Sequence, residues 1–169
     1  AKVEEIKNSP LDLTNIEKVE LTRTIDIWML SQLNQHIKEA TEALEGFQTR
    51  KALQESLFLL KKDVDHYLYR VKHLLDSQDP AIIYVLSTVL EAWIRLLAPF
   101  TCEELWATYG GEGYVSQASW PEADESLVSP QIEKSEELVQ NIIKDINQIK
   151  KMVKGDVEKI HVYLAPDWK

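Results

Sequence analysis

IIYVLSTVLEAWIRLLAPFTCEELW, residues 82–106, is the stretch that decides the fold of this chain. From Ile82 to Leu97 apolar residues cover nearly the whole circumference of a helix, and the narrow polar stripe includes the i,i+4 pair Glu91 and Arg95. A helix of this kind lies at the centre of a globular protein, with other helices on most of its sides. It is too short and too often interrupted by polar residues to span a bilayer. The stretch therefore predicts the core helix of a bundle.

Cap residues mark both ends of this core helix. Asp79 is a suitable N-cap and Pro80 a suitable first helical residue. Pro99 ends the helix, and Thr101 with Glu104 then predicts a capping box that opens a further helix.

Three other segments show helical spacing. One runs from about Thr24 to Glu45, with Gly46 as the expected C′ residue. Another runs from about Thr49 to Asp76 and repeats its apolar residues in steps of four and three, as a packing seam does. That seam consists of Leu53, Leu57, Leu60, Val64, Tyr67, Val71 and Leu74. The last runs from Ile132 to Val153, with Gly155 closing it, and its own seam consists of Val139, Ile142, Ile146, Ile149 and Val153.

Non-helical patterns follow the core. Between Tyr109 and Pro130 the composition is that of a loop, in which residues 114–119 are expected to form a short extended piece. At the end of the chain Ile160, Val162 and Leu164 alternate with other residues, which predicts a strand.

These elements define a mainly α fold, an antiparallel helical bundle with a small C-terminal helix–strand appendage. Residues 1–21 are interpreted as a connector or frayed start, and residues 22–128 as the bundle. Residues 129–169 are interpreted as a helix-plus-strand module that continues in a longer parent protein.

Composition narrows the function. The chain has 169 residues, 44% of them hydrophobic and 28% charged, which is ordinary for a globular domain. Its formal net charge of −9 argues against a uniformly basic nucleic-acid binder, so any RNA contact must come from a local patch. A single cysteine, Cys102, excludes a disulfide framework and suits a reducing cytoplasm. No signal peptide or membrane-spanning run is recognisable, so no membrane partner is expected.

One helical face is a candidate phosphate-contacting surface. On the side of the second helix opposite its seam, Lys62, His66, Tyr69 and His73 fall in one line with Arg70 at the edge. Lysine and arginine supply charge, and tyrosine and histidine can stack or donate hydrogen bonds. The alternative interpretation is the solvated face of an amphipathic helix.

A second basic cluster consists of Lys150, Lys151 and Lys154, at the end of the last long helix. Cations at that end also complement the helix dipole, which is the simpler explanation. Residues 151–155, KMVKG, superficially resemble the KMSKS loop of class I synthetases, but they lack both serines and include Val153 of the seam, so we do not interpret them as a catalytic loop.

No catalytic or metal-binding group emerges from the spacing. The glycines at 110–113 lack the Lys-Ser/Thr of a P-loop, and Cys102 and the histidines form no nucleophile–base or metal-ligand pattern. We therefore predict no catalytic residue, metal or cofactor site in this chain.

Several motifs carry a family resemblance. They are DIWMLSQLN (26–34), LLAPF (96–100), EELW (103–106), GGEGYVS (110–116) and SWPEAD (119–124). Together they resemble the anticodon-binding helical domain of class I aminoacyl-tRNA synthetases. FQTRKA (47–52) and KIHVYLAPDWK (159–169) are similar to leucyl-tRNA synthetases of the archaeal and eukaryotic type. The second proline that commonly follows LLAPF in that family is missing here.

The resemblance implies a role in tRNA charging. The parent would activate leucine with ATP and Mg²⁺ and charge tRNA(Leu) in the cytoplasm, through catalytic and editing domains that lie outside this chain. The chain would dock tRNA(Leu) by its backbone, since leucine enzymes of this family generally do not read the anticodon. Two alternatives stay open: an anticodon-reading domain of an isoleucyl- or valyl-tRNA synthetase, and a helical protein–protein adaptor without enzymatic function.

Overall fold

A computed structural model of the chain describes residues 18–75, 79–96, 99–109, 113–153 and 159–163. It divides into two compact units, residues 1–133 and 134–169. The described helical elements are α2 (Thr24–Glu45), α3 (Thr49–Leu53), the π-helical turn η1 (Gln54–Leu59), α4 (Leu60–Val71), α5 (Pro80–Leu96), α6 (Pro99–Tyr109), the 3₁₀ turns η3 (Val115–Gln117) and η4 (Glu125–Leu127), and α7 (Pro130–Met152). The mainly α helical fold is thus confirmed.

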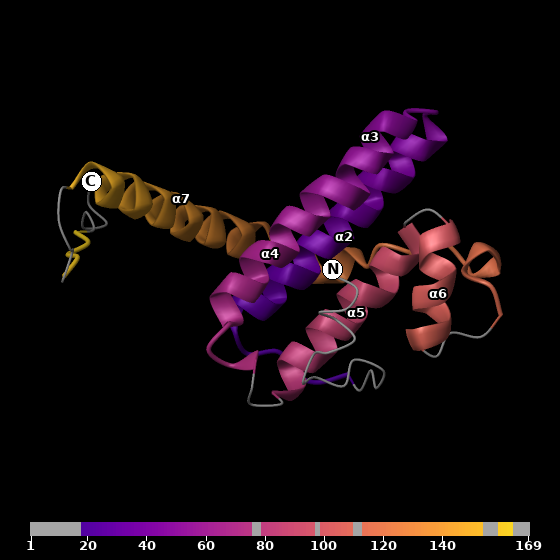
Figure 1. Cartoon of the computed structure of the whole chain (residues 1–169), viewed down its shortest axis with the longest axis horizontal. Coiled ribbons are helices and arrows are strands. Elements are labelled where there is room, and N and C mark those ends of the chain that lie inside the picture. Colours follow the sequence, from indigo (N-terminus) through magenta and orange to yellow (C-terminus); the bar gives the residue numbers. More distant parts are fainter. Residues whose placement is uncertain (1–17, 76–78, 97–98, 110–112, 154–158, 164–169) are drawn as a thin grey trace. The chain divides into compact units, whose positions relative to one another are not determined.

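The first unit is built around α2. This helix packs against α3, α4 and α5, and Figure 1 shows it antiparallel to the continuous helix formed by α3, η1 and α4. Aliphatic and aromatic side chains from α2, α4 and α5 form one core. Its most deeply buried members include Met29, Leu30, Leu60, Tyr67, Ile82 and Val85.

Helix α2 ends at Glu45 as predicted, but Gly46 is not its C′ residue. Gly46 is the C-cap residue with φ −82°, so it does not take the left-handed conformation. The next residue, Phe47, has φ +56°. The N–H of Phe47 donates to the carbonyl of Leu44, and the N–H of Gln48 donates to that of Ala43 at 2.7 Å. These are the two bonds of a Schellman motif, and they place Phe47 at C′.

The second predicted helix is one helix with an irregularity that the pattern does not reveal. η1 adds a π turn between α3 and α4, and a π turn accommodates an additional residue. The buried positions are therefore Ala52, before the turn, and Ser56, within it, while Leu53, expected in the seam, is 50% exposed. From Leu60 onward the expected core face is correct.

The core helix α5 begins as predicted. Carboxylate oxygen Oδ1 of Asp79 accepts hydrogen bonds from the N–H groups of Ala81 at 2.9 Å and Ile82 at 3.3 Å. The expected i,i+4 ion pair between Glu91 and Arg95 is also present. Both are local features of one helix, which a sequence pattern specifies well.

The start of α6 differs from the prediction. The helix begins at Pro99, so Thr101 lies inside its first turn and the expected capping box with Glu104 is wrong. Proline is favoured in the first turn of a helix because its missing N–H would have no intrahelical partner there. The neighbouring carboxylate of Glu103 has a different role, since it accepts from the N–H groups of Val115 at 3.0 Å and Ser116 at 3.3 Å.

Those two bonds explain a second correction. Residues 115–117, inside the piece expected to be extended, form the 3₁₀ turn η3. Glu103 supplies the acceptor for its first N–H groups and so stabilises the turn. Between Trp120 and Ser129 the chain then follows α2 back toward its N-terminal half. The hydrogen bonds that fasten it are Trp120 Nε1 to Thr41 Oγ1 at 2.9 Å, Asp124 N to Asn34 Oδ1 at 2.6 Å and Ser129 N to Ser31 Oγ at 2.8 Å.

The second unit consists, in its described part, of most of α7 and residues 159–163. On α7 Val139, Ile142 and Ile146 are half-buried, but Ile149 and Val153 are 57% and 48% exposed. The predicted strand stays unconfirmed, because residues 159–163 have no strand assignment and Leu164 lies outside the described residues. Gly155, predicted to close the helix, also lies outside them. No helix in the described ranges combines the length and apolarity needed to cross a membrane.

Candidate nucleic-acid interface

The predicted contact line follows one side of α4. Lys62 and His73 are exposed, Tyr69 is 53% exposed, and His66 and Arg70 are half-buried. Tyr69 interacts with a residue that sequence reasoning did not single out, because Nζ of Lys72 lies 4.7 Å from the centre of its ring. A cation over an aromatic ring is attracted by the ring quadrupole, so this pair presents charge and an aromatic surface together.

His66 does not lie fully on the outward side. Its ring meets the indole of Trp28 edge-to-face, with the ring centres 5.3 Å apart. Trp28 is a buried residue of α2, so His66 covers the edge of the core. The prediction that His66 belongs to one solvent-facing line with Lys62 and Tyr69 is thus only partly right.

The structure identifies a longer exposed face, which we call the outward stripe. Its members all lie on the side of the α3–η1–α4 helix opposite Ala52, Ser56 and Leu60, and all are exposed. They are Arg50, Gln54, Phe58, Lys62, Asp65, Tyr69 and Lys72. Sequence reasoning missed Arg50, Phe58 and Lys72, although the separation of Phe58 from the apolar seam is visible in the sequence. The stripe combines three cations with two aromatic rings.

The second basic cluster belongs to the second unit. Lys150 and Lys151 are exposed in the last turn of α7, within the second unit, and Lys154 lies outside the described residues. Because the outward stripe lies on the first unit, we treat the two clusters independently.

A polar network holds α4 against the start of the bundle. The hydroxyl of Tyr67 donates to Oδ1 of Asp26 at 2.8 Å, and Nε of Arg23 donates to Oδ2 of the same carboxylate at 2.6 Å. Arg23 also forms a bidentate pair with Asp79, at 2.7 and 2.9 Å. This network joins α2, α4 and the N-terminus of α5.

Electrostatics in this network favour the charged carboxylate of Asp79 and the neutral hydroxyl of Tyr67. The hydrogen bond from Arg23 lowers the pKa of Asp79, despite partial burial. Burial and the neighbouring Asp26 raise the pKa of Tyr67, so its hydroxyl remains a hydrogen-bond donor. The network therefore has a positioning role in the bundle.

A histidine fixes the middle of the same helix. Nδ1 of His36 lies 3.0 Å from Glu55, and Nε2 lies 3.0 Å from Asp63. Burial lowers the pKa of His36, but the hydrogen bonds to Asp63 and Glu55 outweigh that effect, so the pKa is raised. With both nitrogens donating, a protonated His36 connects α2 to residues on either side of the boundary between η1 and α4.

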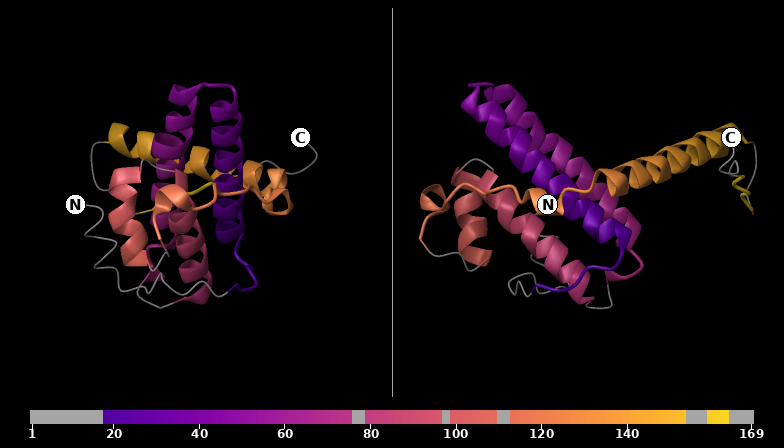
Figure 2. Two further views of the ribbon diagram at one scale, coloured as in Figure 1. Left: turned by 90° about the vertical axis from the view of Figure 1, so that its right-hand side faces the viewer. Right: turned by 180° about the vertical axis from the view of Figure 1, so that it is seen from behind.

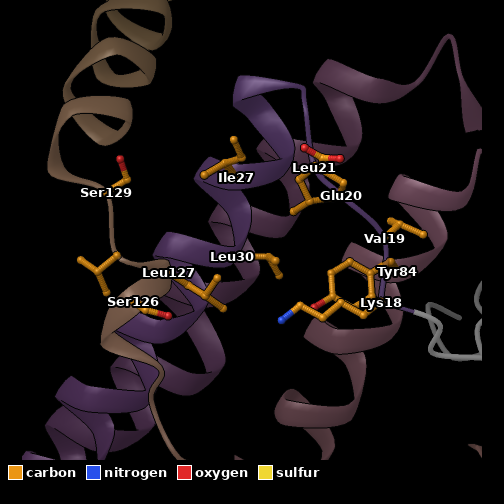
Figure 3. A pocket seen from close by; sticks show the side chains of 11 residues that line it. Lys18, Val19, Glu20, Leu21, Ile27, Leu30, Tyr84, Ser126, Leu127 and Ser129 are labelled. Atoms are coloured by element: carbon orange, nitrogen blue, oxygen red, sulfur yellow. The ribbon is translucent and has the colours of Figure 1, made fainter.

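A pocket of 480 Å³ opens elsewhere on the first unit (Figure 3). Segment 18–21, the N-terminal half of α2, Tyr84 of α5 and residues 126–129 surround it. The lining is mostly apolar, with Lys18 and Glu20 as its charged members. None of the predicted contact residues lines this pocket.

The described side chains provide binding surfaces and structural links. Cys102 is buried, and burial raises the pKa of its thiol, which disfavours the nucleophilic thiolate. Within the described ranges no three His, Cys, Asp or Glu side chains converge as metal ligands would. The outward stripe, by contrast, offers exposed cations and rings, which suit the phosphates and bases of a nucleic acid.

Comparison with known proteins agrees with the resemblance noted in the sequence. Residues 26–161 match the family described as the anticodon-binding domain of tRNA ligase. The match covers most of the chain, and the chain belongs to this family.

The relatives narrow the family further. The chain is 49% identical to the leucine–tRNA ligase of Methanothermobacter thermautotrophicus over 93% of its own length and 17% of that protein. It is 44% identical to the leucine–tRNA ligase of Pyrococcus horikoshii, over 87% of the chain and 15% of the relative. It is 41% identical to the leucine–tRNA ligase of Methanosarcina mazei, over 87% of the chain and 14% of that relative. The chain thus spans about one-sixth of the length of these curated relatives.

The family motifs have structural explanations. In DIWMLSQLN, Asp26 binds Tyr67 and Arg23, and Trp28 packs on His66. Ser31 accepts from Ser129 and donates to Glu133 at the start of α7, while Asn34 holds Asp124. This opening motif therefore holds α2 to α4 and to residues 124–133. None of its residues belongs to the outward stripe.

Proposed function

We propose that this chain is the tRNA-binding domain of a leucine–tRNA ligase. It docks and positions tRNA(Leu) for aminoacylation by catalytic and editing domains of the same polypeptide. The observation that carries the proposal is the 49% identity to an archaeal leucine–tRNA ligase over 93% of the chain. The parent enzyme would use leucine, ATP and Mg²⁺ in the cytoplasm, and those reactants would bind its other domains.

The proposed contact is the face of α4 that carries Lys62, Tyr69 and Arg70, with His66 at its inner edge and His73 in the turn that follows the helix. The opposite side of the helix is committed to the core through Leu60, Tyr67 and Val71, which are at most 1% exposed. Contacts from lysine and arginine to phosphates position an RNA without reading its sequence. A domain of net charge −9 can bind a polyanion in this way only through such a local face.

We further propose the domain division predicted from the sequence, with the helical bundle at 22–128 and the C-terminal module at 129–169. The polar links from Ser31 to Ser129 and Glu133 attach the start of α7 to α2, so residues 129–133 would join the module to the bundle. Lys150 and Lys151, in the last turn of α7, and Lys154, three residues further along the sequence, form a second candidate for RNA contact.

Binding of the 169-residue chain to transcripts provides the test. The chain should bind tRNA(Leu) weakly and with a strong salt dependence, and a changed anticodon should leave the affinity nearly unaltered. A large loss of affinity on changing the anticodon would favour the isoleucine or valine alternative. Absence of tRNA binding, together with a concentration-dependent mass in light scattering, would favour the protein–protein adaptor.

A further inference from the structure

We propose that Phe58 stacks on an unpaired base of the bound RNA, and that the π turn η1 exists to present it. This inference rests on the proposed function and adds to it a residue and a mode of contact. Phe58 is 69% exposed on the outward stripe, one turn before Lys62. Figure 2 shows the hairpin of α2 and the α3–η1–α4 helix that carries this stripe from two further directions.

The π turn is held by contacts from other parts of the first unit. Trp93 of α5 donates through its indole nitrogen to the carbonyl of Ser56 at 2.7 Å. His36 of α2 binds the carboxylate of Glu55. The hydroxyl of Ser56 donates to the carbonyl of Ala52 at 2.9 Å, within the helix. A rare backbone geometry that its surroundings fix so thoroughly is typical of functional positions.

The turn places small residues inside and large ones outside. Ala52 and Ser56 are 5% and 3% exposed, whereas Leu53 and Phe58 are 50% and 69% exposed. The apolar seam predicted from the sequence would have buried Leu53, so the observed geometry forgoes hydrophobic burial. The exposed ring of Phe58 is therefore available to a partner outside the helix.

The surroundings of Phe58 favour RNA as that partner. Arg50 and Lys62 lie on the same stripe before and after it, and Tyr69 with Lys72 continues the stripe. Phe58 and Tyr69 are 11 residues apart, or roughly 16 Å along the helix, so each ring would serve a different nucleotide. Surfaces that bury against another protein are depleted in lysine, whereas aromatic rings alternating with cations are typical of single-stranded nucleic-acid binding.

Substitutions at Phe58 test this inference in the full 169-residue chain. Affinity would be measured for a tRNA(Leu) transcript and for a fully paired RNA duplex. Phe58→Ala should weaken tRNA binding by about five- to a hundredfold, leave the salt dependence unchanged and leave duplex binding unaffected, because stacking needs an unpaired base. Phe58→Trp should retain the affinity, and Phe58→Leu should lose it because leucine has no ring. Tyr114→Ala, at another exposed aromatic residue, is the matched control.

The outcomes separate this inference from the proposed function. If Phe58→Ala leaves tRNA affinity unchanged while glutamates at Lys62 and Arg70 reduce it, the stacking role is wrong and the proposed function stands. If Phe58→Leu binds as well as the unaltered chain, stacking is again wrong, because tRNA affinity would not depend on an aromatic ring. If neither Phe58→Ala nor the charge reversal affects tRNA binding, the proposed interface fails altogether. Because Phe58 is exposed, unaltered circular dichroism is expected for every variant.

Discussion

The indole nitrogen of Trp93 donates a 2.7 Å hydrogen bond to the main-chain carbonyl of Ser56, so the core helix α5 directly supports the π turn. Trp93 is half-buried and packs against the main core. Its ring thus has two roles, an apolar contact and a polar one, and substitutions can separate them.

Trp93→Phe should keep most of the apolar contact and lose the hydrogen bond. The carbonyl of Ser56 would then lack its tertiary donor, and the free energy of unfolding should fall by about 1–3 kcal/mol. Trp93→Ala should cost more, about 3–5 kcal/mol, because the ring is lost as well. Urea titration measures both values, and a Trp93→Phe variant as stable as the unaltered chain would show that the bond contributes nothing.

His36 should make stability depend on pH. Its pKa is raised in the folded chain, so its contribution is complete below the ordinary value of 6.5 and is lost as the pH rises through the folded value. His36→Gln should therefore reduce the free energy of unfolding more at about pH 5 than at about pH 9. Chemical denaturation at both pH values gives the comparison. A penalty that grows toward high pH would contradict the observed pairing with Glu55 and Asp63.

Phe47 should be replaceable by glycine with a gain in stability. A non-glycine residue at φ +56° is strained by roughly 1–2 kcal/mol, and glycine removes this strain at some cost in chain entropy. We expect Phe47→Gly to raise the melting temperature. Gly46→Ala is the control, since Gly46 has φ −82° and its substitution should be tolerated with a small shift of the neighbouring Glu42 carbonyl. The reverse ranking would mean that Gly46 is the left-handed residue.

Replacing Asp26 should lower the free energy of unfolding more than removing the hydroxyl of its hydrogen-bond partner Tyr67. Asp26→Ala leaves the buried hydroxyl of Tyr67 and the guanidinium of Arg23 without this shared acceptor, and we expect a loss of about 3–5 kcal/mol. Tyr67→Phe leaves the pair of Asp26 and Arg23 intact, and should cost about 1 kcal/mol. Equal losses in a denaturant titration would show that the ion pair adds nothing beyond the tyrosine hydrogen bond.

Local patterns predicted much of this fold. The Asp79 cap, the Pro80 start and the apolar circumference of α5 each depend on residues close together in the sequence, and each is present in the structure. The bounds of α2 were predictable for the same reason. Errors arose at helix ends: Phe47 and not Gly46 is the C′ residue of α2, and α6 begins at Pro99, before the predicted cap Thr101.

Long-range pairs could not be predicted. The contacts of Trp93 with Ser56, of His36 with Glu55 and Asp63, and of Tyr67 with Asp26 join residues far apart in the chain, and no spacing rule connects them. The π turn depends on such contacts, so its extra residue was absent from the predicted pattern and Leu53 was placed inside. At the candidate interface the exposure of Lys62, Tyr69 and His73 followed from the helical period, whereas the packing of His66 on Trp28 required the tertiary structure.

The salt dependence of tRNA binding tests the central claim most directly. The measurement compares tRNA(Leu) affinity across a range of salt concentrations for the unaltered chain, the Lys62→Glu/Arg70→Glu variant and the Lys150→Glu/Lys151→Glu variant. If the α4 face binds phosphates, the first variant should bind more weakly, with a log–log salt slope flatter by roughly two units, while the second changes less. A Lys62→Glu/Arg70→Glu variant that stays folded and keeps both affinity and slope would contradict the account.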